Sequence, residues 1–143
     1  MTKSVLFAEY AAYHADPRNR ACHAVGIPLI VMAILGLFAL VSVGPTNLAV
    51  VVAALVLLYY ASLDILGAAI SAVIFTALYG IGIHLAPLWN VAAFIVGWVF
   101  QLIGHRYEGN KPKFLTNLIY LLVGPLFIFE ELVLGAVGGK RPT

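Results

Sequence analysis

The chain carries four histidines, His14, His23, His84 and His105, which are spread along the sequence and not gathered in one motif. Neutral imidazole is the commonest metal ligand in proteins, and three imidazoles leave coordination positions open for a substrate. Membrane di-iron enzymes use many histidines in clustered His-x-x-His-His boxes, which this sequence lacks. A metal site built from these histidines is therefore predicted to be mononuclear.

Other catalytic motifs are absent from the sequence. It contains neither a Gly-x-Ser-x-Gly elbow for serine hydrolysis nor a glycine-rich phosphate loop. Its single cysteine, Cys22, excludes an internal disulfide. We expect Cys22 to be a small apolar filler beside a helix start.

The composition indicates a membrane protein. The 143 residues are 63% hydrophobic and 10% charged, whereas soluble domains are about 45–50% apolar and about 25% charged. The formal net charge of +2 is too small to indicate nucleic-acid binding. We therefore expect residues 1–143 to form a single membrane domain whose main partner is lipid.

The charged residues divide the chain into candidate membrane spans. Two uncharged runs, 21–63 and 65–105, are each long enough for two helices of about 20 residues. Each run is broken near its middle, by Gly-Pro-Thr-Asn at 44–47 and by His-Leu-Ala-Pro at 84–87, which is the chemistry of turns. The prediction is four transmembrane helices, at 24–43, 46–63, 65–83 and 88–104.

A last apolar stretch, Phe114 to Phe129, is short for a span and contains Asn117 and Pro125. We expect it to form a C-terminal re-entrant or interfacial helix. The two acidic residues after it, at 130 and 131, fit its water boundary, and an inward-facing glutamate is the alternative. The fold class is thus an all-α integral membrane helical bundle.

The N-terminal segment is predicted to be a cytoplasmic helix from Lys3 to His14, because Phe7, Tyr10 and His14 are spaced to share one helical face. Pro17 stops this helix, and Asp16-Pro17 is typical of an N-cap and first turn for the next one.

Basic residues set the expected topology. With four spans, six of them share one side, and the connections at 44–47 and 84–87 have none, so the positive-inside rule places that side in the cytoplasm. Lys140 and Arg141 join it if the last stretch turns back. This topology gathers three histidines at one face and leaves His84 at the other, across about 30 Å of hydrocarbon. The host membrane is predicted to be a bacterial inner membrane or the endoplasmic reticulum, with the site facing the cytoplasm.

Four residues near the end of the fourth span, Trp98, Gln101, His105 and Glu108, form one stripe along a helix. Polar groups in such a position usually face protein or a cavity instead of lipid. Asn19, Glu108 or a tyrosine are candidates to orient metal-binding histidines.

These features also have explanations without chemistry. A histidine at a membrane boundary is often only an interfacial polar residue, and Asp64 fits a solvated loop. An aromatic belt accounts for Trp89, Tyr59, Tyr60 and Tyr107. A small transporter or channel, which would need polar groups deep in several spans, and a metal-free structural membrane protein are therefore the alternatives to an enzyme.

Two sequence blocks resemble the small polytopic membrane 2-hydroxy fatty acid dioxygenases. The first runs from Tyr10 to Asn19 (YAAYHADPRN) and on to His23, and is similar to Tyr-x-x-Tyr-His-x-x-Pro-x-Asn-x-x-x-His. The second, residues 97–105 (GWVFQLIGH), is similar to Gly-Trp-x-x-Gln-x-x-Gly-His and is followed by a glutamate and a proline. This chain departs from the family in having Lys113 after that proline.

The resemblance implies an enzyme that uses Fe2+ and O2 for the α-oxidation of a long-chain 2-hydroxy fatty acid, which becomes one carbon shorter. Arginines on the basic side are candidates to attract the anionic head group: Arg18, Arg20 and Arg106. The expected catalytic and metal-binding residues are His14, His23 and His105, with His84 as a fourth candidate ligand and with Asn19, Gln101, Glu108, Tyr10 and Tyr13 as residues that orient them.

Overall fold

The computed structural model describes residues 1–138. Lys140 and Arg141, part of the topology prediction, lie outside the described residues. Helices make up nearly all of the regular structure, which confirms the all-α class. In chain order the elements are α1 (Lys3–Ala12), α2 (Pro17–Phe38), β1 (Ser42–Val43), β2 (Thr46–Asn47), α3 (Leu48–Leu63), α4 (Ile65–Gly82), α5 (Pro87–Glu108), the 3-10 turn η1 (Lys113–Leu115) and α6 (Tyr120–Ala136).

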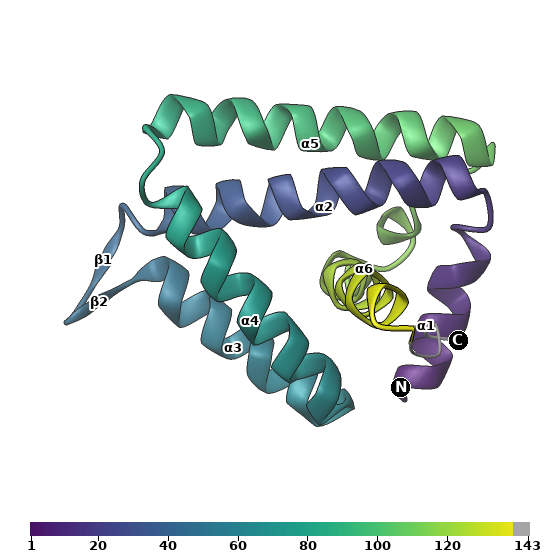
Figure 1. Ribbon diagram of the computed structural model, residues 1–143, viewed down its shortest axis with the longest axis horizontal. Coiled ribbons are helices and arrows are strands. Elements are labelled where there is room, and N and C mark those ends of the chain that lie inside the picture. Colours follow the sequence, from purple (N-terminus) through teal and green to yellow (C-terminus); the bar gives the residue numbers. More distant parts are fainter. Residues whose placement is uncertain (139–143) are drawn as a thin grey trace.

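Helices α2 and α5 lie side by side along their length and run in opposite directions (Figure 1). Glycines bring the two backbones together. A Cβ on Gly26 would lie 2.7 Å from the Gly97 carbonyl oxygen, and a Cβ on Gly97 would lie 2.8 Å from the Gly26 carbonyl oxygen. Such close approach is typical of small residues between membrane helices. The pairing sets the start of α2 beside the end of α5.

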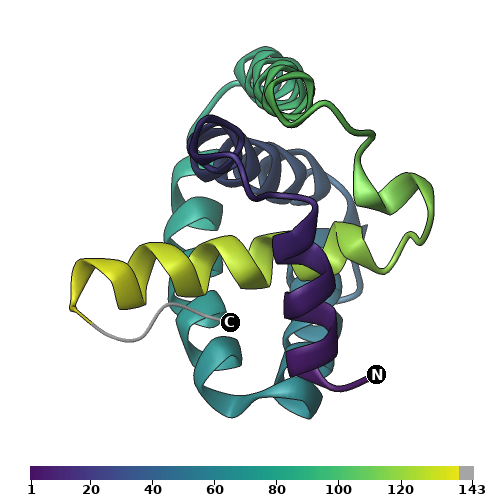
Figure 2. The same cartoon turned by 90° about the vertical axis from the view of Figure 1, so that its right-hand side faces the viewer.

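The other helices pack on the far side of α2. Helices α3 and α4 form a hairpin that slants away from α2, and α6 runs across this arrangement, seen almost end-on in Figure 1 and from the side in Figure 2. Helix α6 contributes more residues to the buried hydrophobic core than any other helix. The core residues from α6 are Tyr120, Val123, Leu126, Phe127, Ile128 and Phe129, packed with Phe7 of α1, Tyr60 of α3 and Phe75 of α4.

Three helices, α2, α4 and α5, are long and apolar enough to cross a membrane. Helix α3 is apolar but has 16 residues, fewer than the roughly 20 that a span usually needs. Three of the four expected spans therefore fit by length and composition, and the second stays a prediction. Helix α2 begins seven residues before the predicted span at 24–43. Its first turn contains Arg18 and Arg20, so these charges mark the edge of the apolar segment and not the start of the helix.

The last apolar stretch was predicted with wrong bounds. The structure divides it into η1 and α6, and α6 runs past residue 129 to Ala136. The prediction stopped at the acidic pair because charges usually mark water. Glu130 is instead 2% exposed, and its carboxylate lies 2.8 Å from Lys3 Nζ. An ion pair inside the protein lets the helix continue through this charge.

Asp64 lies in the connection between α3 and α4, as expected, and its side chain is 31% exposed, but it also has partners within the protein. Its carboxylate caps α4 by accepting a hydrogen bond from the Gly67 N–H (2.7 Å), and it accepts another from Lys3 Nζ (2.9 Å). The hydrogen bond from Lys3 lowers the pKa of Asp64. Lys3 therefore ties α1 to both α4 and α6.

The turn expected at 44–47 is present, but it belongs to a short antiparallel ladder that the sequence did not reveal. Ser42 pairs with Asn47, and Val43 pairs with Thr46. Gly44 has a φ of 55°, a left-handed conformation that favours glycine. Strands of two residues are too short to show an alternating pattern.

The predicted start of the second helix is confirmed. The Asp16 side chain accepts a hydrogen bond from the Arg18 N–H (2.8 Å), and Pro17 is the first residue of α2. Helix α1 ends at Ala12, earlier than predicted, so His14 lies in the connection between α1 and α2.

Candidate metal centre

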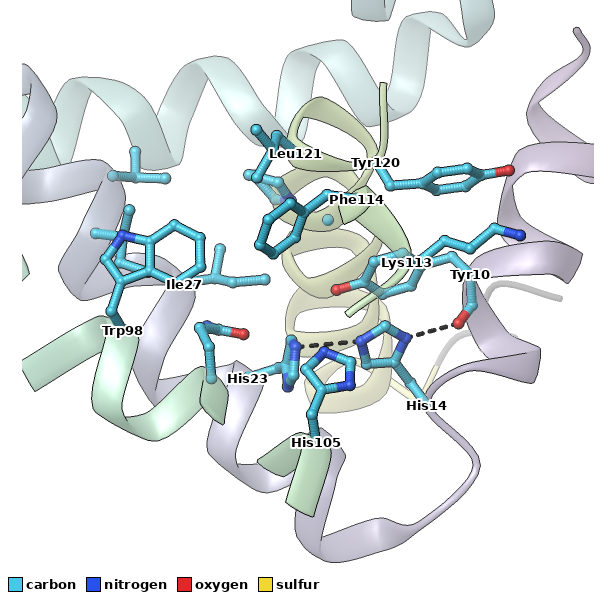
Figure 3. Close-up of a pocket in the computed structure, with 15 residues that line it drawn as sticks. Tyr10, His14, His23, Ile27, Trp98, His105, Lys113, Phe114, Tyr120 and Leu121 are labelled. Carbon is cyan, nitrogen blue, oxygen red and sulfur yellow. Dashed lines mark hydrogen bonds between the residues drawn. The ribbon is translucent and has the colours of Figure 1, made fainter. Parts of the chain in front are cut away.

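Three histidines meet at the end of the α2–α5 pair (Figure 3). His14 comes from the α1–α2 connection, His23 from the second turn of α2 and His105 from the last turn of α5. All three side chains are buried, their ring centroids are 4.4–5.0 Å apart, and one ring nitrogen of each lies within 4.8 Å of the others. His84 precedes α5 at its other end, and a helix of 22 residues is about 33 Å long. The structure thus leaves His84 out of this cluster.

Hydrogen bonds decide which nitrogen of each ring faces the centre. The Nδ1–H groups of His14 and His23 donate to the main-chain carbonyls of Tyr10 (2.7 Å) and Asn19 (3.0 Å), and a carbonyl can only accept. The side-chain oxygen of Asn110 accepts from His105 Nδ1 (3.2 Å). Each Nε2 atom is therefore left with a lone pair, as in metal-bound imidazoles that donate their other N–H to a carbonyl.

The lone pairs of this cluster face one another. The Nε2 atoms of His14 and His23 lie 3.1 Å apart, and two lone pairs at this distance repel unless a cation lies between or beside them. Burial lowers the pKa of His14 to about 4, which keeps the ring in the neutral form that binds metals. The donor set therefore fits a metal ion, whose identity it does not specify.

Glu108 joins the end of α5 to the connection that carries His14. Its carboxylate accepts hydrogen bonds from the N–H groups of Ala15 (3.0 Å) and Asp16 (2.9 Å) and from the Asn19 side-chain amide (3.0 Å). Asn19 is fully buried, and its main-chain carbonyl is the one that orients His23. The structure places both Asn19 and Glu108 where the sequence analysis expects orienting residues.

The other expected orienting residues, Tyr10, Gln101 and Tyr13, differ in how closely they contact the histidine cluster. The Tyr10 ring stacks on His14 with a centroid distance of 3.9 Å. Gln101 lines a cavity beside the cluster, and its amide nitrogen is buried without a hydrogen-bond partner among residues 1–138. Tyr13 is half-buried and does not line the cavity. Its ring lies 4.4 Å from Lys113 Nζ, and its main-chain carbonyl accepts a hydrogen bond from the Asn19 amide (3.3 Å).

Two of the three arginines expected to attract a head group have other partners. Arg20 donates to the main-chain carbonyl of His14 (2.7 Å) and pairs with Glu131 (3.0 Å). Arg18 pairs with Asp16. Arg106 is exposed on α5, and none of the three lines the cavity.

A cavity of about 90 Å³ extends from the histidine cluster between α2, α5 and α6 (Figure 3). Its wall is mainly apolar away from the histidines. Besides the three histidines, Tyr10 and Gln101, it is lined by Ile27, Ile30, Val31, Trp98, Lys113, Phe114, Tyr120, Leu121, Gly124 and Pro125. The sequence analysis missed the wall supplied by η1 and α6, and it missed Asn110, because no spacing pattern links these residues to the histidines.

Comparison with known proteins agrees with the two sequence blocks. A family described as 2-hydroxy-palmitic acid dioxygenase Mpo1-like matches residues 2–137. The chain belongs to the Mpo1-like family. A relative, the 2-hydroxy-palmitic acid dioxygenase MPO1 of Saccharomyces cerevisiae, is 27% identical over 129 residues, which cover 85% of this chain and 74% of the relative. No solved structure matches the chain.

The resemblance to this family is thereby confirmed. Both blocks of this Mpo1-like chain contribute to the histidine cluster, the first through His14 and His23 and the second through His105.

Proposed function

We propose that this chain is an Fe2+-dependent dioxygenase that converts long-chain 2-hydroxy fatty acids to fatty acids one carbon shorter. The observation that carries the proposal is the convergence of three buried imidazoles, His14, His23 and His105, at one end of a mainly apolar cavity. Family membership and the name of the MPO1 relative support the substrate class.

The reaction balances without an external reductant. The C1–C2 bond of the 2-hydroxy acid breaks, C1 leaves as CO2, and C2 is oxidised from an alcohol to the carboxyl carbon of the shorter acid. One O2 accepts the four electrons released, and water is the other product. Bound Fe2+ supplies the reactivity toward O2 that amino-acid side chains lack.

The chain's own residues are proposed to hold the metal ion, to orient its ligands and to shield the substrate from water. His14, His23 and His105 are the proposed ligands of Fe2+, and the carbonyls and amide that bind their Nδ1–H groups keep the Nε2 atoms directed inward. Apolar side chains such as Trp98 and Leu121 line the space proposed for the alkyl tail. Excluding water there protects the reacting end of the lipid from side reactions.

We expect purified protein loaded with Fe2+ to consume O2 and to shorten 2-hydroxyhexadecanoic acid, but not hexadecanoic acid, because only the 2-hydroxy acid has C2 at the alcohol level from which the balanced reaction starts. Mass spectrometry of the lipid products and an oxygen electrode measure this result. Treatment with a strong chelator should abolish turnover, and Fe2+ should restore it.

Two outcomes contradict the proposal. Equal consumption of both acids would show that the 2-hydroxyl has no role, and full turnover after chelation would remove iron from the reaction. A protein that holds no metal and turns over neither acid would favour the metal-free structural alternative.

We further propose that the histidine end of the bundle faces the cytoplasm of a multi-pass membrane protein. Five basic residues surround this end: Arg18, Arg20, Arg106, Lys111 and Lys113. The connections at the other end, residues 39–47 and 83–86, contain none, which is the asymmetry that the positive-inside rule describes.

Cysteine labelling checks this topology. In a Cys22→Ala background, Lys111→Cys should react with a membrane-impermeant maleimide only from the cytoplasmic side, and Ser42→Cys only from the opposite side, since both positions are exposed. Labelling of both from one side would contradict an odd number of crossings between them.

A further inference from the structure

Tyr10 is held rigidly between the histidine cluster and the core. Its side chain is 3% exposed. Its ring stacks on the His14 ring at 3.9 Å and contacts the Phe127 ring at 4.9 Å, centroid to centroid. Packing on both sides fixes the direction of the phenol, so its hydroxyl has little freedom to seek a partner elsewhere.

The Tyr10 hydroxyl faces the cavity and has no hydrogen-bond partner among the described residues. It lies beside Gly124 of α6, where an added Cβ would be 3.2 Å from the phenol oxygen and 3.5 Å from Ile27. All three residues line the cavity, and Figure 3 shows the Tyr10 side chain beside His14 within it. The phenol oxygen is not among the fully enclosed polar atoms that lack a partner, so it is open to the cavity, where it can form a hydrogen bond with a water or with a polar atom of a ligand.

We infer that the Tyr10 hydroxyl binds the lipid substrate directly, by donating a hydrogen bond to its carboxylate. The inference rests on the proposed function and names a group that recognises the head of the substrate. A fatty acid carries its polar atoms at one end. A head group bound near the histidines is therefore the part of the substrate that can form a hydrogen bond with the Tyr10 hydroxyl. A carboxylate only accepts hydrogen bonds, and a bond from a hydroxyl to a charged acceptor is stronger than one between neutral groups.

The apolar lining around the hydroxyl gives the bond its selectivity. Ile27, Val31, Leu121 and Pro125 offer no hydrogen bond to a head group, so the Tyr10 hydroxyl lies in an apolar part of the wall. Besides the histidines, the other polar side chains that line the cavity are Gln101, Lys113 and Tyr120. The same geometry directs the alkyl tail away from His14 along the apolar wall. The 2-hydroxyl of the substrate is then left to the histidine end.

Fluorescence of Trp98 tests the inference without requiring turnover. Trp98 lines the cavity, and the second tryptophan, Trp89, is 67% exposed, so Trp89→Phe leaves Trp98 as the reporter. The protein is loaded with Fe2+ and titrated without O2. Tyr10→Phe should weaken binding of 2-hydroxyhexadecanoic acid about tenfold while leaving the iron content unchanged, because the ring stacked on His14 and the main-chain carbonyl bonded to it are both retained.

The methyl ester of the same acid identifies the group that is bound. It lacks the carboxylate charge, so the Tyr10→Phe variant and the parent should bind it with affinities within about twofold of each other. Tyr107→Phe is the matched control, because Tyr107 is exposed and lies outside the cavity; it should bind the acid as the parent does. Equal binding of the acid by Tyr10→Phe and the parent would overturn the inference and leave only a water on the hydroxyl.

A second variant guards against a folding defect. Gly124→Ala places a methyl group next to the phenol oxygen, and we expect it to weaken binding of the acid with iron content unchanged; unchanged binding would overturn the inference. Loss of iron from Tyr10→Phe would also overturn it, since Tyr10 would then act through His14. Acid binding that depends on Tyr10 in a protein without turnover would support the inference and refute the proposed reaction.

Discussion

Alanine in place of His14, His23 or His105 is expected to remove the bound iron from the purified protein. Each substitution deletes one of three imidazoles whose ring nitrogens lie within 4.8 Å of one another. The affinity should fall by more than the roughly 10–100-fold that orienting residues contribute in metal sites. Elemental analysis after gel filtration measures the iron that stays bound to each variant.

His84→Ala is the matched control. His84 precedes α5 at the end away from the cluster, so this variant should keep the iron content of the parent. Helical circular dichroism in detergent checks that all four variants are folded. If His84→Ala lost iron as completely as the others, the site would contain four histidines and the placement of the α4–α5 connection would be wrong.

Glu108→Ala is expected to weaken iron binding about 10–100-fold, although Glu108 is not one of the three proposed metal ligands. The variant removes the acceptor of three hydrogen bonds, from the Ala15 and Asp16 N–H groups and the Asn19 amide. The connection that carries His14 is then no longer fastened to the end of α5. Competition with a chelator of known affinity measures the change.

Two further variants separate this effect from general destabilisation. Glu108→Gln keeps one oxygen but turns an NH2 group toward N–H donors, so it should recover only part of the affinity. Asp64→Asn removes a carboxylate that caps a helix far along the chain from the cluster. It should lower thermal stability and leave the iron affinity of the folded protein unchanged. Equal losses of iron affinity in Asp64→Asn and Glu108→Ala would refute a specific role for Glu108.

The residues of the candidate centre could be predicted because the expected membrane topology leaves few arrangements. Charges and turns divide the chain into four expected spans, and this topology places three histidines at one face and the fourth at the other. His14, His23 and His105 meet at one end of the structure, and His84 lies at the other. Whether the three bind iron is a prediction that the variants above address.

Features that depend on tertiary partners were not predictable. The acidic pair was predicted to mark a water boundary, with an inward-facing glutamate as the alternative. The structure supports the alternative for Glu130, and nothing in the sequence shows that its partner is Lys3, near the start of the chain. For the same reason the sequence did not show that Asp64, in the connection before α4, pairs with Lys3. The cavity wall from α6 was missed because a purely apolar segment has the same pattern whether it faces lipid or a ligand.

The order in which the centre's parts leave the ribosome has a consequence for biogenesis. His23 lies at the start of α2 and His105 at the end of α5, so α3, α4 and nearly all of α5 are synthesised between them. At a synthesis rate of about 5–20 residues per second, His105 is added to the chain several seconds after His14 and His23. The proposed three-histidine metal complex therefore requires that α5 has docked antiparallel to α2. Binding of the proposed metal would thus distinguish a chain folded through α5 from one arrested after its first helices.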